Sequence, residues 1–561
     1  MDKKFRSNLQ PGTTLWAGRR AQWRALGLND EELTRPKIAI VNSSSKLSSC
    51  FSHLDEVAAE VSQAIRDAGA VPFEIRTAAS SDFITSAGRG GSYILPTRDL
   101  ITNDIEVAVE GALLDGMVCL ASCDKTTPGQ LMAAARLNIP SIIVICGYQK
   151  TGEYKGHPVD IEEVFLRAGY IGTGGTTVED LAGMADNAVR SPGVCAGMGT
   201  ANTMHIAAEA LGFTLPGSAP VLALSEKMHA NAGASGRRIV EMVMQDLKPR
   251  DILTPSSFRN AAIAVLSVSG SINAVKHLQA VASEAELDVD LYDLFDQCAR
   301  STPLLAAIRP NGDGTIAQFE EAGGARMLLK RLEPLLDRQA RSVSGRTLGE
   351  ILDEVRPGPT DVIASLEAPL SRVPSLVLVR GTLLPGGGIV RIGGTQARTM
   401  KFRGPAQIFH SRDEALAAVQ AGEIRRGSVV VLRGLGVRGG PGMAMTSAVV
   451  FQLDGAGLID DVAVITEGQL SGLVNKGLVV GEASPEAAEG GPLALLDEGD
   501  VISIDVERRV VDLEVPEDVL AQRRLQKRSF GAKPPRGWLS IYQSCVAPVH
   551  EGAVLRQGGG C

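Results

Sequence analysis

The feature that most constrains the fold is a regular alternation of short apolar runs and amphipathic stretches between about residues 37 and 336. The apolar runs predict strands, and the amphipathic stretches predict helices with one apolar face. The predicted strands are 38–41, 71–75, 117–121 and 141–146, and the predicted helices are 53–68, 98–114, 128–137, 203–211, 236–245 and 273–285. Strands that alternate with helices pair in parallel, with the helices on the faces of the sheet. We therefore expect an α/β domain with a parallel sheet over residues 1–355.

After Pro357 the pattern changes to short strands that are separated by glycine-rich turns. The predicted strands are 377–384, 388–392, 428–432, 461–466, 478–480 and 500–506, with one short helix at 413–420. Such a pattern is typical of a small β-barrel or β-sandwich. We expect a smaller, β-barrel-like domain at residues 370–561, joined to the first domain by the polar, proline-containing segment 338–370.

Composition excludes several classes of protein. Hydrophobic residues make up 44% of the chain and the net charge is −8, whereas a disordered chain has fewer apolar residues and a higher charge. The chain lacks the basic excess of a nucleic-acid-binding protein, so no nucleic-acid partner is expected. No uncharged apolar run reaches the ~18 residues that cross a membrane, and the polar start is unlike a secretory signal. The eight cysteines are widely spaced without a Cys-x-x-Cys pair, which favours a cytoplasmic protein whose cysteines are core residues or ligands.

Residues 122–129, Ser-Cys-Asp-Lys-Thr-Thr-Pro-Gly, lie where a predicted strand ends and a predicted helix begins, with Thr127 as the expected N-cap. Ligands gather at this carboxyl edge of a parallel sheet, and a helix N-terminus favours negative charge. Cys50 and Cys195 also lie in loops before predicted helices, so with Cys123 they could converge on one site. The residues alone fit equally well a buried cysteine beside a solvated Asp–Lys pair.

The other cysteines and two glycine-rich segments are the remaining candidates for functional residues. Cys119 and Cys146 lie inside apolar runs and are expected to be core residues, whereas the remaining three cysteines suggest no role. The glycine-rich segments 438–443 and 466–472 would let the backbone approach a ligand closely. Taken alone, their composition favours ordinary barrel turns.

In combination, these motifs resemble the dihydroxy-acid dehydratase family, which also contains sugar-acid dehydratases and 6-phosphogluconate dehydratase. The resemblance extends from about residue 37 to residue 554. It is carried by the segments 123–129, 200–204, 438–443, 471–472 and 484–492, in the family's order. The Lys-Thr-Thr-Pro-Gly form of the first motif is similar to the dihydroxy-acid and sugar-acid branch.

The resemblance implies removal of water from a small 2,3-dihydroxy or sugar acid, with release of a 2-keto acid. It implies that Cys50, Cys123 and Cys195 ligate an iron–sulfur cluster, for which [2Fe–2S] is favoured over [4Fe–4S]. Three thiolates leave one iron open as a Lewis acid for the departing C3 hydroxyl. The resemblance also implies a Mg²⁺ ion that would bind the substrate carboxylate and the enolate-like intermediate.

By the same resemblance, Asp82, Asp124 and a carbamylated Lys125 would hold the Mg²⁺, because oxygen ligands suit this ion. Ser471 would be the base that removes the C2 proton, and its weak hydroxyl would need a nearby cation to favour the alkoxide. Family members are dimers or tetramers, so a homodimer or homotetramer is expected.

The chain departs from the family pattern around this site. The family's Mg²⁺-binding glutamate after Gly-Pro-Gly-Met is missing from the shortened segment 443–447, and Arg89 stands where some members have another glutamate. Family residues are also replaced by Glu467, Gln469, Lys476 and Glu482. In the favoured interpretation the enzyme is active on an altered substrate, with Arg89 or Lys476 binding a carboxylate and Glu467 or Glu482 replacing the lost ligand. The alternatives are a changed substrate class, such as a hydroxy amino acid, or a cluster-bearing protein without dehydratase turnover.

Overall fold

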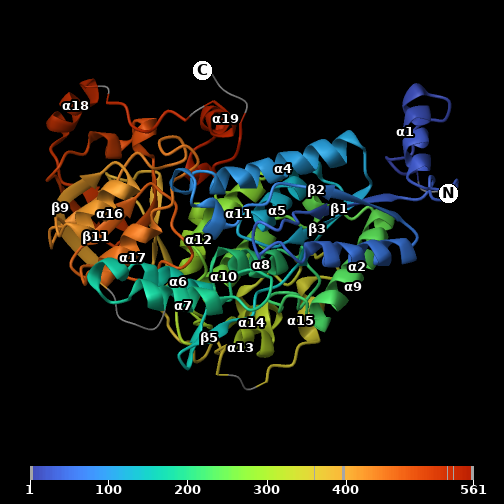
Figure 1. The fold of residues 1–561 in the computed structure, drawn as a ribbon, viewed down its shortest axis with the longest axis horizontal. Coiled ribbons are helices and arrows are strands. Elements are labelled where there is room, and N and C mark those ends of the chain that lie inside the picture. Colours follow the sequence, from blue (N-terminus) through green and yellow to red (C-terminus); the bar gives the residue numbers. More distant parts are fainter. Residues whose placement is uncertain (1–3, 359–360, 394–398, 527, 535, 557–561) are drawn as a thin grey trace.

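The computed structural model describes residues 4–358, 361–393, 399–526, 528–534 and 536–556. Its N-terminal part contains a four-stranded parallel sheet in the order β2-β1-β3-β4 (Figure 1). The strands are β1 (Lys37–Asn42), β2 (Val71–Arg76), β3 (Gly116–Ala121) and β4 (Ser141–Ile145). Each overlaps a strand predicted from the apolar runs, and the parallel α/β domain is confirmed.

Helices cover both faces of this sheet. α2 (Leu54–Asp67) and α9 (Glu226–Gln245) pack together on one face, and α4 (Ile94–Gly111) and α5 (Thr126–Leu137) pack on the other. α4 begins four residues before its predicted start, with Pro96 in its first turn. α9 begins ten residues before its predicted start, because polar residues in its first turns hid the apolar period.

A further layer of helices packs beyond α5. It consists of α8 (Thr200–Ala210), α10 (Pro255–Ser267), α11 (Asn273–Glu284) and α12 (Leu291–Ala299). Neither α10 nor α12 was among the predicted helices. The remaining elements of this part are α1 (Thr14–Ala25), α3 (Asp82–Thr85), β5 (Gly152–Tyr154), β6 (His157–Val159), α6 (Ile161–Ala168), α7 (Val178–Ala188), α13 (Ile316–Glu321), α14 (Gly324–Leu332) and α15 (Leu348–Asp353).

The C-terminal part is built on an eight-stranded sheet in the order β14-β13-β9-β10-β11-β12-β8-β7. The strands are β7 (Leu376–Val379), β8 (Gly387–Arg391), β9 (Lys401–Phe409), β10 (Val429–Leu432), β11 (Ala463–Thr466), β12 (Leu478–Ser484), β13 (Val501–Asp505) and β14 (Val510–Leu513). Arg380, just after β7, forms a β-bridge with Val510 of β14, so the two edge strands meet. This contact makes the sheet barrel-like, as the sequence predicted.

Two expectations for this part were wrong in detail. The sequence predicted one short helix among the strands, but α17 (Ser447–Gly455) lies between β10 and β11 in addition to α16 (Arg412–Gln420). Strands β9 and β14 were not predicted, and in β9 Gly404 and Pro405 interrupt the apolar pattern. α18 (Glu517–Leu525) and α19 (Trp538–Cys545) follow the barrel. No helix in the described part of the chain is long and apolar enough to cross a membrane.

Candidate active site

The turn between β3 and α5 presents three consecutive site residues at the carboxyl edge of the parallel sheet. The predicted N-cap at Thr127 was wrong, because α5 begins at Thr126 and its N-cap position is Lys125. The Thr126 hydroxyl accepts a hydrogen bond from the Ser122 amide (3.0 Å) and donates one to the Cys123 carbonyl (2.8 Å). These two bonds order the turn locally, while the Ser122 hydroxyl donates to the Cys50 carbonyl and His205 of α8 bonds the Ser122 carbonyl.

The three predicted cysteine ligands lie near one another. Cys50 and Cys123 are buried, and Cys195 is partly buried. A hydrogen bond from the Cys123 thiol lowers the pKa of Cys50 to about 7. Burial and then the charge of Cys50 raise the pKa of Cys195 well above its usual value. The expected core residues Cys119 and Cys146 are fully buried.

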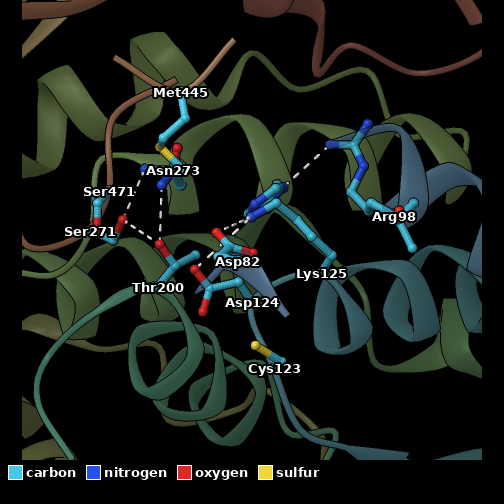
Figure 2. A network of polar contacts seen from close by, with 12 residues as sticks. Asp82, Arg98, Cys123, Asp124, Lys125, Thr200, Ser271, Asn273, Met445 and Ser471 are labelled. Carbon is cyan, nitrogen blue, oxygen red and sulfur yellow. Dashed lines mark hydrogen bonds and ion pairs between the residues drawn. The ribbon is translucent and has the colours of Figure 1, made fainter. Parts of the chain in front are cut away.

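The three predicted Mg²⁺ ligands form an ion-paired group (Figure 2). The buried Lys125 ammonium lies 3.3 Å from an Asp82 carboxylate oxygen and 4.0 Å from an Asp124 oxygen. Burial, followed by the charge of Asp82, raises the pKa of Asp124 to about 7. The second oxygen of Asp82 is buried and has no hydrogen-bond partner in the described part of the chain. The group therefore combines closely spaced oxygen atoms with spare bonding capacity.

Ser471 lies in the loop between β11 and β12, and residues from both parts of the chain hold this loop. The Ser471 amide donates to the Ser447 hydroxyl (2.6 Å), and the Ser471 hydroxyl accepts from the Leu473 amide (3.2 Å). Asn273 at the start of α11 donates to the carbonyl of Leu470 (2.8 Å). Figure 2 shows Ser471 facing the Asp82–Asp124–Lys125 group from the opposite side of the site.

Two further features of the serine loop were not predicted from the sequence. Arg391, at the end of β8, donates to the carbonyls of Gly472, Met198 and Ser269, which joins the serine loop to the Cys195 loop. A Cβ atom at Gly472 would lie 2.8 Å from the amide nitrogen of α8's first residue, so only glycine allows this approach. In the sequence, the one indication of this role was the position of Arg391 at the end of an otherwise apolar strand.

A cavity of about 40 Å³ lies between the cysteine turn and the serine loop. Asp82, Cys123, Asp124, Cys195 and Ser471 all line it. The remaining predicted site residues, Cys50 and Lys125, are not among its lining residues but contact residues that are. The structure therefore gathers the predicted residues around one cavity that both parts of the chain enclose.

Glu162 of α6 also lines this cavity and was not predicted. Both of its carboxylate oxygens are buried without a hydrogen-bond partner in the described part of the chain. In the sequence it follows Asp160 and precedes Glu163, so it looked like one of the acidic residues that commonly begin a helix. No sequence signal separated it from Glu163, which is only partly buried and pairs with Arg167.

The two cations suggested for carboxylate binding lie away from the cavity. Arg89 is exposed and is not among the lining residues. Lys476 forms an ion pair with Asp454 (2.6 Å) and a hydrogen bond with Tyr170 (3.2 Å). Neither arrangement supports a role in binding a substrate within this cavity.

The two suggested replacement carboxylates are also engaged elsewhere. Glu467 accepts hydrogen bonds from the amides of Gly434, Leu435 and Ala487, so it ties glycine-rich turns together. Glu482 forms a fully buried ion pair with Lys276 of α11. Both carboxylates therefore hold the barrel-like domain in place and do not line the cavity.

The donor set fits the expected groups by its chemistry. Thiolates are the usual ligands of iron–sulfur clusters, and carboxylate oxygens suit Mg²⁺. Within the described residues, no group of three or more His, Cys, Asp or Glu side chains has the spacing of a formed metal site. The fit rests on the shared cavity and on the unpartnered Asp82 oxygen.

Comparison with known proteins identifies the family. The model of the dihydroxy-acid/6-phosphogluconate dehydratase N-terminal region matches residues 35–351, and the corresponding C-terminal model matches residues 361–553. A dihydroxy-acid dehydratase of Methanococcoides burtonii is 40% identical over 542 residues, which are 96% of this chain and 98% of that protein. A dihydroxy-acid dehydratase of Pyrococcus furiosus has the same identity and the same coverage. The chain therefore belongs to the dihydroxy-acid/6-phosphogluconate dehydratase family, whose named members are hydro-lyases.

Proposed function

We propose that this hydro-lyase removes water from a small 2,3-dihydroxy or sugar acid and releases a 2-keto acid. The observation that carries the proposal is the single cavity, which places thiols and carboxylates of the α/β domain opposite Ser471 of the barrel-like domain. A dehydration needs a base at C2 and an acid at the leaving C3 hydroxyl. The two walls of the cavity bring candidates for both roles together.

Cys50, Cys123 and Cys195 would hold an iron–sulfur cluster, for which we favour the [2Fe–2S] form. Such a cluster supplies a Lewis acid for the leaving hydroxyl. Asp82 and Asp124 would hold Mg²⁺ together with Lys125, whose carbamylation would exchange a buried ammonium for oxygen ligands. These side chains would orient the substrate carboxylate and the C2 hydroxyl.

Ser471 would remove the C2 proton. The Leu473 amide donates a hydrogen bond to the Ser471 hydroxyl oxygen, which favours the alkoxide form. Asn273 and Arg391 hold the backbone on either side of Ser471, because they donate hydrogen bonds to the carbonyls of Leu470 and Gly472. The base would therefore be held in one position relative to the opposite wall.

Replacing Ser471 by Ala tests the base assignment. The protein is purified anaerobically, and a panel of 2,3-dihydroxy acids and aldonic acids is screened for release of keto acid. We expect Ser471→Ala to lower kcat at least ~100-fold because general-base catalysis is lost. Ser544→Ala, on an exposed position of α19, is the control and should leave kcat unchanged. Undiminished turnover in Ser471→Ala would reject the base, and no turnover in the unmodified holoenzyme would favour a cluster-bearing protein without dehydratase activity.

The division into domains at residues 1–355 and 370–561 is part of this proposal, and each family match lies within or close to one of these ranges. We also propose a cytoplasmic homodimer or homotetramer. Sedimentation of the holoenzyme would measure the number of subunits.

A further inference from the structure

Glu162 lies in the first turn of α6, and only 6% of its surface is exposed. Its carboxylate rests against the backbone of the Cys195 loop, where a Cβ atom at Gly197 would overlap the carboxylate. Phe165, one turn further along α6, lines the same cavity. The side chain of Glu162 therefore belongs to the cavity wall.

This carboxyl group has no partner of its own. Neither oxygen has a hydrogen bond within the described residues, and burial raises the pKa of Glu162 well above its usual value. The charges of Asp160 and Asp124 raise this pKa further. The charges of Arg391 and Arg309 lower it, but less than burial raises it. Buried polar groups without partners are rare in native proteins because they lose their hydration without compensation. A group supplied by a ligand would complete the bonding of this carboxyl.

Most of the other polar groups that line the cavity have partners or roles in the proposed function, and the Asn202 amide oxygen is a second buried acceptor without a partner in the described residues. Asp82 and Asp124 form the ion-paired group with Lys125, and Ser471 is the proposed base. Phe83, Phe165 and Leu473 contribute apolar surface. Glu162 is thus a polar group of the cavity wall that has no role in the proposed reaction at C1 to C3.

We infer that Glu162 is a specificity-determining residue that accepts a hydrogen bond from an O–H or N–H group carried by the substrate beyond C3. This inference rests on the proposed function and names its substrate class, namely 2,3-dihydroxy acids with a further hydroxyl or ammonium group. An aliphatic 2,3-dihydroxy acid would fill the cavity with methyl groups and leave the buried carboxyl unpaired. A site built to bond a substrate hydroxyl rejects an analogue that lacks it far more strongly than an apolar pocket rejects an added methyl group.

The test compares 2,3-dihydroxy acids of equal carbon number that end in a methyl, a hydroxymethyl or an aminomethyl group. For the unmodified holoenzyme we expect kcat/KM to be at least ~10-fold higher with one of the polar acids than with the methyl acid. Glu162→Leu should reduce this ratio at least ~10-fold, mainly through KM, while Glu162→Gln should retain part of it. The control is Glu163→Gln, which removes the neighbouring carboxylate that pairs with Arg167 and should leave the ratio unchanged.

Iron and Mg²⁺ contents are measured for every variant. Equal or better turnover of the methyl acid by the unmodified enzyme would overturn the inference, although the proposed dehydration would stand. An unchanged ratio in Glu162→Leu, or a loss of Mg²⁺ affinity in Glu162→Gln with the ratio intact, would overturn it as well. If none of the acids is converted, the proposed function itself fails. Should Glu162→Leu not fold, Glu162→Ser carries the same comparison.

Discussion

The cysteine turn, residues 121–126, and the serine loop, residues 467–473, face each other across one cavity but are stabilised differently. The turn has hydrogen bonds among its own residues, through the Thr126 hydroxyl, and its Ser122 is also hydrogen-bonded to Cys50 and to His205 of α8. The loop is held from outside, by Asn273 of α11 and Arg391 of β8. The turn therefore combines local bonds with contacts inside the α/β domain, whereas the loop depends on residues from both parts of the chain.

Three departures from the family pattern lie on the serine side of the cavity. The cysteine turn keeps the family's residues, whereas Glu467, Lys476 and Glu482 lie on or near the serine loop and β12. In the structure all three have partners within the protein. None of these three residues lines the cavity, so their side chains support the fold around the serine loop.

The largest expected effect comes from removing one proposed cluster ligand from the cysteine turn. Cys123→Ser should remove iron from the protein and lower kcat by more than ~1,000-fold, because a metal centre contributes several kcal/mol to the transition state. Iron and sulfide analysis and keto-acid release measure the two effects. Cys545→Ser, in α19 and outside the cavity, is the matched control and should keep both values. Normal iron content in Cys123→Ser would show that this thiol is not a ligand.

The next effect tests how the two walls are joined. Lys276 and Glu482 form a fully buried ion pair between α11 and β12, so Lys276→Met would leave an unpaired buried carboxylate. We expect the free energy of unfolding to fall by about 3–5 kcal/mol, measured by urea denaturation. Adding Glu482→Gln should restore most of this loss, because no charge is then left buried alone.

Lys401→Met breaks an exposed pair with Glu507 and serves as the comparison, with an expected change below about 1 kcal/mol. Equal losses at the buried and the exposed pair would contradict a joining role for Lys276 and Glu482. A loss that the double variant does not restore would show that packing matters here and charge does not.

A smaller effect should come from Arg391, which bonds the serine loop and also Met198 of the Cys195 loop. Arg391→Met removes the guanidinium from the carbonyls that it bridges, so Ser471 should shift relative to the opposite wall. A displacement of about 1 Å costs about 100-fold in rate, and we expect kcat to fall by this factor with unchanged iron content. Arg372→Ala, at an exposed position before β7, should change neither value. Loss of iron in Arg391→Met would show that the walls are not independent.

The same division explains what the sequence could predict. The cysteine turn follows a buried strand and precedes a helix, so its position at the sheet edge followed from the apolar pattern alone. The start of α5 was predicted two residues too late, because the Thr126 hydroxyl, and not that of Thr127, bonds the turn. The roles of the individual residues came from the family resemblance.

The serine loop and Glu162 show where prediction from the sequence stops. Arg391, Asn273 and Ser447 are distant in the chain and contact the loop only after folding. Glu162 and Glu163 are adjacent and chemically identical, yet one is buried in the cavity and the other pairs with Arg167. Helix orientation, which the local pattern does not specify, decides between them.

The smallest effect concerns the glycine-rich turn at residues 438–443, whose amides are bonded by Glu486. Burial, followed by the charge of Glu467, raises the pKa of Glu486 from 4.5 to about 8. The folded state therefore binds a proton more tightly than the unfolded state does. Its contribution to the free energy of unfolding is present in full below about pH 4.5 and is lost as the pH rises to about 8.

Between pH 6 and 8, Glu486 should thus make the free energy of unfolding fall with rising pH, by at most ~1.4 kcal/mol per pH unit. Glu486→Gln should lower stability at pH 6 and make the pH dependence shallower, because the amide does not titrate. Urea denaturation at several pH values measures both slopes. Glu514→Gln, which removes an exposed partner of Arg403, should keep the original slope. An identical slope in Glu486→Gln would assign the pH dependence to other groups, such as Asp124 on the cysteine wall, whose pKa is also raised to about 7.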